Sequence, residues 1–295
     1  MTLSQELEQR KGSLFSQRQR TLKASIHLAG NALFTGKHVH LNIHPAAPGF
    51  GIVFQRIDLP GRPQLPAKLE YVQATPRCTI LGNQGVVIQT VEHLLSALHA
   101  CGVDNALIEI DGAELPIFDG SAKEFVEQIE AVGVCEQDEP KAVYRLTSPI
   151  SWSQGDVHLI ALPSDEYRIT YTLFYPHSSI VGTQYYSVQV NEDSFKKEVA
   201  PCRTFCIYEE VAPLVEKGLI KGGGLENAVI IKDDQVANPG GLRFPDEMVR
   251  HKILDVIGDL SLMGFSFLAH IIAIRSGHSS NVAFAKQLVT KMEIL

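Results

Sequence analysis

The amino-acid sequence runs through the same order of elements twice, and this repetition limits the possible folds more than any other feature. In each half, several short segments alternate apolar and polar residues, as strands with one buried face do. A helical pattern follows that has a histidine near its start and ends at a glycine, namely His93 and Gly102 in the first half and His251 and Gly264 in the second. An apolar strand pattern comes next in both halves, NALIEI and then AHIIAI.

A duplicated α+β unit is the simplest interpretation of this order, although two unrelated α+β segments would also produce it. We expect two similar domains, each a β-sheet packed on helices, with the helices of the two domains facing each other between the sheets. The length of 295 residues suits two domains. We place domain I at residues 19–136 and domain II at residues 142–295, with the acidic segment 135–141 as the linker. The polar residues 1–18 are expected to form an N-terminal extension.

Composition excludes several classes of protein. The 26 Lys and Arg residues against 33 Asp and Glu give a net charge of −7 without a basic run, which argues against nucleic-acid binding. We see no transmembrane segment, since no apolar run reaches the ~18 residues that span a bilayer, and no secretory signal. The five cysteines are scattered and form no CxxC pair, which is typical of reduced thiols. We therefore expect a cytoplasmic protein.

The segment from Arg250 to Asp259 carries the most chemical information. Residues four apart share one face of a helix, so His251, Asp255 and Asp259 form a polar stripe among apolar neighbours. Imidazole and carboxylate are zinc ligands, and an HxxxD pair can hold one side of the ion. A buried histidine paired with a carboxylate one turn away would give the same pattern, so spacing alone leaves both possibilities open.

A second histidine, His93, lies at the start of the helical pattern in the first half, directly after Glu92. As a third ligand, His93 would leave one position of a tetrahedral ion open for water, as in catalytic zinc sites. Glu92 could then accept a proton from that water. An acidic residue at a helix start is also favoured by the helix dipole alone.

Two shorter segments contain further candidates. The histidine of Arg275-Ser-Gly-His278 follows a strand pattern and is either catalytic or an exposed loop residue. The segment Cys202-Arg-Thr-Phe205 offers the hydroxyl of Thr204, which could stabilise an oxyanion. The alternative for this segment is a solvated Arg-Thr pair at the end of a strand.

Taken together, these segments resemble the zinc-dependent UDP-3-O-acyl-N-acetylglucosamine deacetylases of lipid A biosynthesis. The matching segments occur in family order from about Gln19 to the C-terminus: QRTLK, TVEHLLSAL, GVDNALIEI, ELPIFDGSA, RTF, GGGLENAVI, HKILDVIGDL and SGH. No single segment is specific, but the set is. The resemblance implies a zinc-dependent hydrolase that removes the N-acetyl group from UDP-3-O-acyl-N-acetylglucosamine and releases acetate. It also implies the two-domain fold, with the site between the domains.

The resemblance further assigns roles to individual residues. It implies that His93, His251 and Asp255 bind one zinc ion, although iron accepts the same ligands, and that Glu92 is the general base. The other implied catalytic residues are Thr204, which would assist the oxyanion, and His278, which would protonate the leaving amine while Asp259 orients it.

A third set of residues would bind the substrate. Lys252 and Arg275 would face the diphosphate and the sugar, and Phe205 would stack on the glucosamine. The full expected set is Cys78, Asp119, Phe205, Gly223, Lys252 and Arg275. We also expect an apolar passage for the acyl chain along residues 205–225, which end in three glycines; the buried face of a helix would give the same apolar stripe.

The chain departs from the family pattern in two places. The family commonly has a GLHSG-like turn near its N-terminus, where this chain has Phe34 in place of the histidine. The segment Phe174-Tyr175-Pro176-His177 differs from the usual Phe-x-His-Pro, which would shift contacts at the uridine end. Neither change removes an implied zinc ligand, so we expect both to affect contacts with the substrate.

Other functions stay open at this point. One alternative is a zinc amidase for a different N-acetyl sugar, and another is a catalytically silent homologue that binds nucleotide sugars. A silent protein with a structural zinc would have no need of Glu92, Thr204, Asp259 and His278, which favours an enzyme. We expect a UDP-sugar lipid as substrate, no nucleic-acid partner and a monomer.

Overall fold

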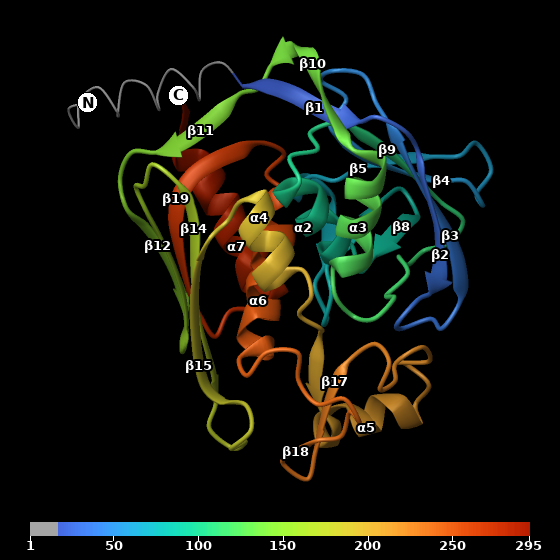
Figure 1. Ribbon diagram of the computed structural model, residues 1–295, viewed down its shortest axis with the longest axis vertical. Coiled ribbons are helices and arrows are strands. Elements are labelled where there is room, and N and C mark those ends of the chain that lie inside the picture. The colour runs from blue at the N-terminus through green and yellow to red at the C-terminus, as the bar shows by residue number, and fades with distance from the viewer. Residues whose placement is uncertain (1–16) are drawn as a thin grey trace.

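A computed structural model of the protein describes residues 17–295, and Figure 1 shows its layers. One β-sheet lies on each outer side, and the long helices lie between them. The expected mixed α+β class is confirmed. The interpretation of the two halves as copies of one unit stays a prediction. Most of the expected N-terminal extension, residues 1–16, lies outside the described residues.

The first half of the chain builds a five-stranded sheet in the order β2-β3-β9-β4-β5. Its strands are β2 (Ile26–Asn31), β3 (His38–Pro45), β4 (Ile52–Arg56), β5 (Gln64–Pro66) and β9 (Ala106–Ile110). In β3 the side chains of Val39, Leu41 and Ile43 are buried while His38 and His40 are exposed. This period of two is what a sheet with one buried face requires.

A three-stranded sheet and two helices complete the first half. The strands are β6 (Val72–Ala74), β7 (Ile80–Asn83) and β8 (Val86–Gln89), preceded by the short 3-10 turn η1 (Leu69–Tyr71). The helices are α2 (Glu92–Ala100) and α3 (Lys123–Val132). Helix α2 is buried over its first seven residues, so polar groups at its start lie inside the molecule.

The second half builds a seven-stranded sheet around β19 (Ser266–Ile274), which pairs with β11, β13 and β14. The other strands are β11 (Val143–Leu146), β12 (Ile150–Gln154), β13 (Val157–Leu162), β14 (Tyr167–Tyr175), β15 (Gly182–Gln189) and β20 (Met292–Ile294). Its helices are α4 (Glu192–Ser194), the π-helical turn η2 (Phe195–Val199), α6 (Glu247–Ser261), α7 (His278–Leu288) and the 3-10 turn η3 (Val289–Lys291). None of the helices within residues 17–295 combines the length and apolar character that crossing a membrane requires.

A small unit projects from the second half at the bottom of Figure 1. It consists of β16 (Phe205–Ile207), α5 (Tyr208–Glu216), β17 (Val229–Lys232) and β18 (Gln235–Val236). Strands β16 and β17 run parallel, and α5 connects them. The residues expected to form the apolar passage belong to this unit.

Two segments differ from the sequence-based expectation. The acidic segment expected to be a linker lies mostly in a strand, β10 (Val134–Pro140), which pairs antiparallel with β1 (Arg18–Leu22). Charged residues are common on exposed two-stranded ribbons, so acidic composition did not distinguish a linker from an edge strand. The spacing of apolar residues over 281–294 predicts one helix through this whole segment, but α7 ends at Leu288, and the chain passes through η3 into β20, which pairs with β11.

Helices α2 and α6 cross closely, and Gly258 allows it. A Cβ atom added at Gly258 would lie 2.4 Å from the carbonyl oxygen of Glu92. Backbone atoms cannot yield to such a contact as a flexible side chain could, so a glycine is needed at this point. The crossing brings the start of α2 against the middle of α6, where the polar stripe lies.

Candidate metal centre and active-site cavity

Three side chains from the two crossing helices form a first buried group, which we call the metal cluster. It consists of His93 from α2 with His251 and Asp255 from α6, and their ligand atoms all lie within 4.8 Å of one another. The two imidazole rings meet edge to face with centroids 5.1 Å apart. Nε2 of His251 is 3.5 Å from Oδ1 of Asp255. The structure thus brings together the three residues expected to bind a metal.

The electrostatics of the metal cluster suit a cation. Burial lowers the pKa of His93 to about 3, and the neighbouring His251 adds to this effect. Burial also lowers the pKa of His251. Burial opposes ionisation of Asp255, but the Nζ atom of Lys252, 2.6 Å from its Oδ2, helps to hold the pKa of Asp255 below its ordinary value. Two neutral imidazoles and an ionised carboxylate are donors that divalent zinc and iron accept, so the residues fit a metal ion.

A second buried group, the acid–base cluster, lies beside the first. It consists of Glu92, Asp259 and His278, the last from the start of α7. Nδ1 of His278 is 3.0 Å from Oδ2 of Asp259 and 3.3 Å from Oε1 of Glu92. The same Oδ2 accepts a hydrogen bond of 2.8 Å from Asn281, and Oδ1 accepts one of 2.6 Å from the hydroxyl of Thr79. Asp259 is therefore well placed to fix the ring of His278.

In the acid–base cluster the pKa of the imidazole shifts in the opposite direction. Burial would lower the pKa of His278, but the carboxylates of Asp259, Glu92 and Asp255 outweigh it and raise the pKa above the ordinary value. Burial raises the pKa of Glu92, and the nearby carboxylates add to the rise while His278 opposes it. A proton donor and a proton acceptor therefore lie side by side, 3.3 Å apart.

Sequence reasoning did not identify Thr79 and Asn281. Asn281 lies three residues after His278, on the same face of α7, and this spacing is a usable signal. Thr79 lies 180 residues from Asp259 along the chain, so no local pattern links the two.

A cavity of about 420 Å³ opens over both clusters. Five of the expected substrate or catalytic residues line it in addition to the clusters: Cys78, Thr204, Phe205, Gly223 and Lys252. Burial raises the pKa of the Cys78 thiol to about 12, so the thiol stays protonated. The ring of Phe205 packs edge to face against Tyr175, with centroids 5.8 Å apart.

One side of the cavity, which we call the apolar wall, is made of hydrophobic side chains and glycines. Its members are Leu33, Phe34, Val211, Val215, Ile220, Gly223 and Gly224. Two backbone hydrogen bonds join the loop at residues 33–34 to the segment 220–224. They run from Gly222 N to Leu33 O at 2.9 Å and from Lys221 N to Phe34 O at 3.1 Å. A Cβ atom at Gly222 would lie 2.0 Å from the carbonyl oxygen of Ala32, so a glycine is needed for this close approach.

The replacement residue Phe34 therefore lies on the apolar wall. The backbone N–H groups of Phe34 and Thr35 donate to the two carboxylate oxygens of the buried Glu114 at 2.7 and 2.8 Å. The carboxylate fixes this loop through its backbone, so the side chain at position 34 changes the lining without changing how the loop is held.

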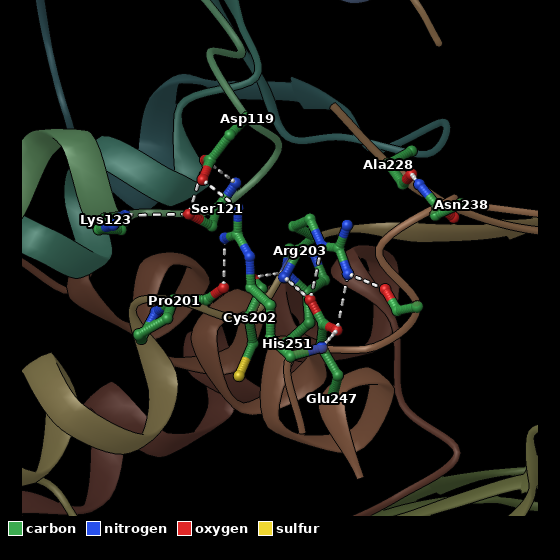
Figure 2. A network of polar contacts seen from close by, with 12 residues as sticks. Asp119, Ser121, Lys123, Pro201, Cys202, Arg203, Ala228, Asn238, Glu247 and His251 are labelled. Carbon is green, nitrogen blue, oxygen red and sulfur yellow. Dashed lines mark hydrogen bonds and ion pairs between the residues drawn. The ribbon is translucent and has the colours of Figure 1, made fainter. Parts of the chain in front are cut away.

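Thr204 is positioned by its backbone on both sides. Its N–H donates to the carbonyl of Gly120 at 2.8 Å, and its carbonyl accepts from Val229 N at 2.7 Å. Asp119, expected near the substrate, does not line the cavity: its carboxylate accepts from Ser121 and pairs with Arg243 at 2.8 Å, and Figure 2 shows it above Arg203. Asp119 thus stabilises the turn whose Gly120 carbonyl holds Thr204.

A second cavity, of about 740 Å³, adjoins the first, because Tyr175 and Lys252 line both. Arg275 lines only this second cavity, with its guanidinium 5.2 Å from the centroid of the Phe174 ring. The segment from Phe174 to His177, which departs from the family pattern, lies along the same cavity. The two cations expected to face a diphosphate therefore share a cavity next to the clusters.

Comparison with known proteins agrees with the resemblance. A family model described as UDP-3-O-acyl N-acetylglycosamine deacetylase matches residues 19–290. A UDP-3-O-acyl-N-acetylglucosamine deacetylase of Chlamydia pneumoniae is 50% identical over 277 residues, 94% of this chain and 98% of the relative. Proteins of the same name from Chlamydia muridarum and Chlamydia felis are 50% and 47% identical over 275 residues, 93% of this chain and 96% and 98% of the relatives. The chain therefore belongs to the UDP-3-O-acyl-N-acetylglucosamine deacetylase family.

Proposed function

We propose that this protein removes the N-acetyl group from UDP-3-O-acyl-N-acetylglucosamine and releases acetate and UDP-3-O-acyl-glucosamine, a step of lipid A biosynthesis. Relatives about 50% identical over most of both chains carry the name of this activity. The observation that carries the proposal is the pairing of the metal cluster with the acid–base cluster at one cavity with an apolar wall. Amide hydrolysis of a lipid-bearing substrate needs all three parts.

The metal ion would be zinc, held by His93, His251 and Asp255. When bound, zinc would polarise the acetyl carbonyl and make water more acidic. Two imidazoles and one carboxylate are a ligand set known from catalytic zinc sites, which keep a position open for water or substrate.

The acid–base cluster would move the protons. Glu92 accepts a proton from the attacking water as the new C–O bond forms. His278, whose ring Asp259 holds, donates a proton to the sugar nitrogen as the C–N bond breaks, so a neutral amine leaves together with acetic acid, which ionises to acetate and a proton. Thr204 donates its hydroxyl proton in a hydrogen bond to the oxygen that becomes negative in the transition state. Two separate groups are suited to this task because one group rarely has a pKa that serves both transfers.

The two cavities would divide the substrate between them. The apolar wall suits an acyl chain, for which each buried methylene contributes about 0.8 kcal/mol. Lys252 and Arg275 suit the diphosphate, because their side chains are basic and both line the adjoining cavity. Phe205 offers a ring face to the sugar, and Cys78 and Gly223 complete the lining.

The two halves, residues 19–136 and 142–295, would be two similar domains that meet at the site. The first supplies Glu92 and His93, and the second supplies the remaining cluster residues. All five cysteines are free thiols, which supports a cytoplasmic location. We further propose that the protein acts as a monomer, since the described residues of one chain supply both clusters.

The test is acetate release from UDP-3-O-acyl-N-acetylglucosamine together with metal analysis of the same preparation. We expect one zinc per chain, loss of acetate release on chelation and its recovery on adding zinc. UDP-N-acetylglucosamine without the acyl chain is the control and should react far more slowly. Equal rates on both substrates, or turnover of another N-acetyl sugar alone, would refute the proposed substrate.

A further inference from the structure

A buried carboxylate at the start of α6 accepts an unusual number of hydrogen bonds. Glu247 is fully buried and lies one helical turn before His251. Its Oε1 accepts from the backbone N of Arg203 at 3.0 Å and from the Nε of Arg203 at 2.8 Å. Its Oε2 accepts from Nη2 of Arg203 at 3.1 Å and from the backbone N of Arg243 at 2.7 Å. Figure 2 shows Arg203 and Glu247 facing each other at the centre of this network.

The ion pair between Arg203 and Glu247 is ionised although it is buried. Burial opposes the charge of Glu247, but the hydrogen bonds and charge of Arg203 bring the pKa of Glu247 below its ordinary value. The hydrogen bonds that Arg203 donates to Glu247 likewise raise the pKa of Arg203. Buried ion pairs are weak contributors to stability compared with apolar packing, but their fixed geometry can specify one arrangement of the chain. The bidentate fork of arginine is well suited to that purpose.

This ion pair is connected to the metal cluster through the peptide bond between Cys202 and Arg203. Arg203 directly follows Cys202, whose carbonyl oxygen accepts a hydrogen bond from Nδ1 of His251 at 3.0 Å. A proton on Nδ1 leaves the lone pair on Nε2, and this nitrogen lies on the side of Asp255. Arg203 also directly precedes Thr204, which lines the cavity over the two clusters.

We propose that Arg203 and Glu247 are positioning residues for the metal centre. The pair fastens residues 202–204 to the first turn of α6, so the Cys202 carbonyl fixes both the tautomer and the ring orientation of His251, and Thr204 stays beside it. The inference rests on the proposed metal centre but not on the identity of the substrate. Hydrogen-bond partners of a metal-binding histidine typically change metal affinity by 10–100-fold, which sets the size of the expected effect.

The test measures zinc affinity by competition with a chromogenic chelator, and it needs no substrate. We expect Glu247→Gln to weaken zinc binding by 10–100-fold, because an amide cannot accept hydrogen bonds at both of its atoms. Arg203→Lys keeps the charge but cannot form the bidentate contact, and we expect a loss of zinc affinity in the same range. Cobalt bound in place of zinc should also show a changed visible absorption spectrum in both variants, since the spectrum reports ligand geometry.

Asp58→Asn is the matched control. It breaks another arginine–carboxylate pair with two contacts, Arg56 to Asp58 at 2.8 and 2.7 Å, which lines neither of the two cavities described above. We expect Asp58→Asn to leave zinc affinity and the cobalt spectrum unchanged.

The results distinguish failure of the positioning role from failure of the proposed function. Wild-type zinc affinity and an unchanged cobalt spectrum in folded Glu247→Gln and Arg203→Lys would overturn the positioning role while leaving the proposed function intact. Failure of the wild-type protein to bind zinc would overturn the proposed function itself. If Glu247→Gln does not fold, the milder Arg203→Lys decides the matter by the same two measurements.

Discussion

The metal cluster and the acid–base cluster contain the same kinds of side chain, yet the pKa values of their imidazoles shift in opposite directions. The metal cluster has two imidazoles to one carboxylate, and burial, together with nearby positive charge, lowers the pKa of both imidazoles. The acid–base cluster has two carboxylates around one imidazole, and their field raises the pKa of His278. The ratio of residue types therefore decides the chemistry. The metal cluster offers lone pairs to a cation, and the acid–base cluster contains groups that can donate and accept protons.

The largest effect should come from removing a member of the metal cluster. We expect His251→Ala to lose bound zinc and to reduce acetate release to background, because a remaining imidazole and carboxylate hold the ion too weakly. The check is zinc content and activity of the same sample. A His251→Ala protein that still carries one zinc per chain would show that the metal cluster is not the metal site.

Removing a member of the acid–base cluster should separate activity from metal binding. We expect Glu92→Gln to reduce the rate by about 10²–10⁴-fold while zinc content stays at the wild-type level. His278→Gln should act similarly, since it removes the proton donor. Steady-state rates beside metal analysis provide the measurement. Near-normal turnover by Glu92→Gln would show that the two clusters are not divided as described.

A smaller and more selective effect is expected at the apolar wall. A Cβ at Gly223 would lie 2.7 Å from Cγ2 of Ile220 and 3.4 Å from Cδ1 of Leu33, so Gly223→Leu should fill the space beside both. We expect kcat/KM for a long-acyl substrate to fall by roughly tenfold, since one or two lost methylene contacts contribute about 0.8 kcal/mol each. A short-acyl analogue should be spared. Equal losses on both substrates would place the acyl chain elsewhere.

The last effect is on stability instead of activity, and it concerns the helix crossing that brings the clusters together. Gly258→Ala should destabilise the protein by about 1–3 kcal/mol, as overpacking does, because its Cβ would collide with the backbone of Glu92. Urea unfolding measures this change. Gly240→Ala is the control, since a Cβ there has no neighbour within 4 Å. A fully stable Gly258→Ala protein would mean that the crossing does not depend on close approach at this glycine.

Helical spacing located most of the chemistry, whereas the division of the residues between the two clusters was implied by the family resemblance alone. Helical spacing identified His251, Asp255 and Asp259 as one stripe of α6, and all three are buried as expected. Spacing along one helix could not show that Asp259 belongs with His278 and Glu92. That division depends on where α2 and α7 meet α6, which is a property of the tertiary packing.

The role of Arg203 was also beyond a local pattern. A solvated Arg-Thr pair was one interpretation of this segment, and for Arg203 it is wrong: the side chain is buried and paired with Glu247, 44 residues later. Glu247 precedes His251 by one helical turn, a spacing that marks a shared face but not a partner from another segment. Contacts between residues so far apart in the sequence depend on the tertiary fold.

Of the two clusters, we expect only the metal cluster to bind the metal ion. X-ray diffraction from crystals grown with one equivalent of zinc, measured at the zinc absorption edge, tests it directly. We expect a single anomalous peak between His93, His251 and Asp255. A peak between Glu92, Asp259 and His278 instead would contradict it.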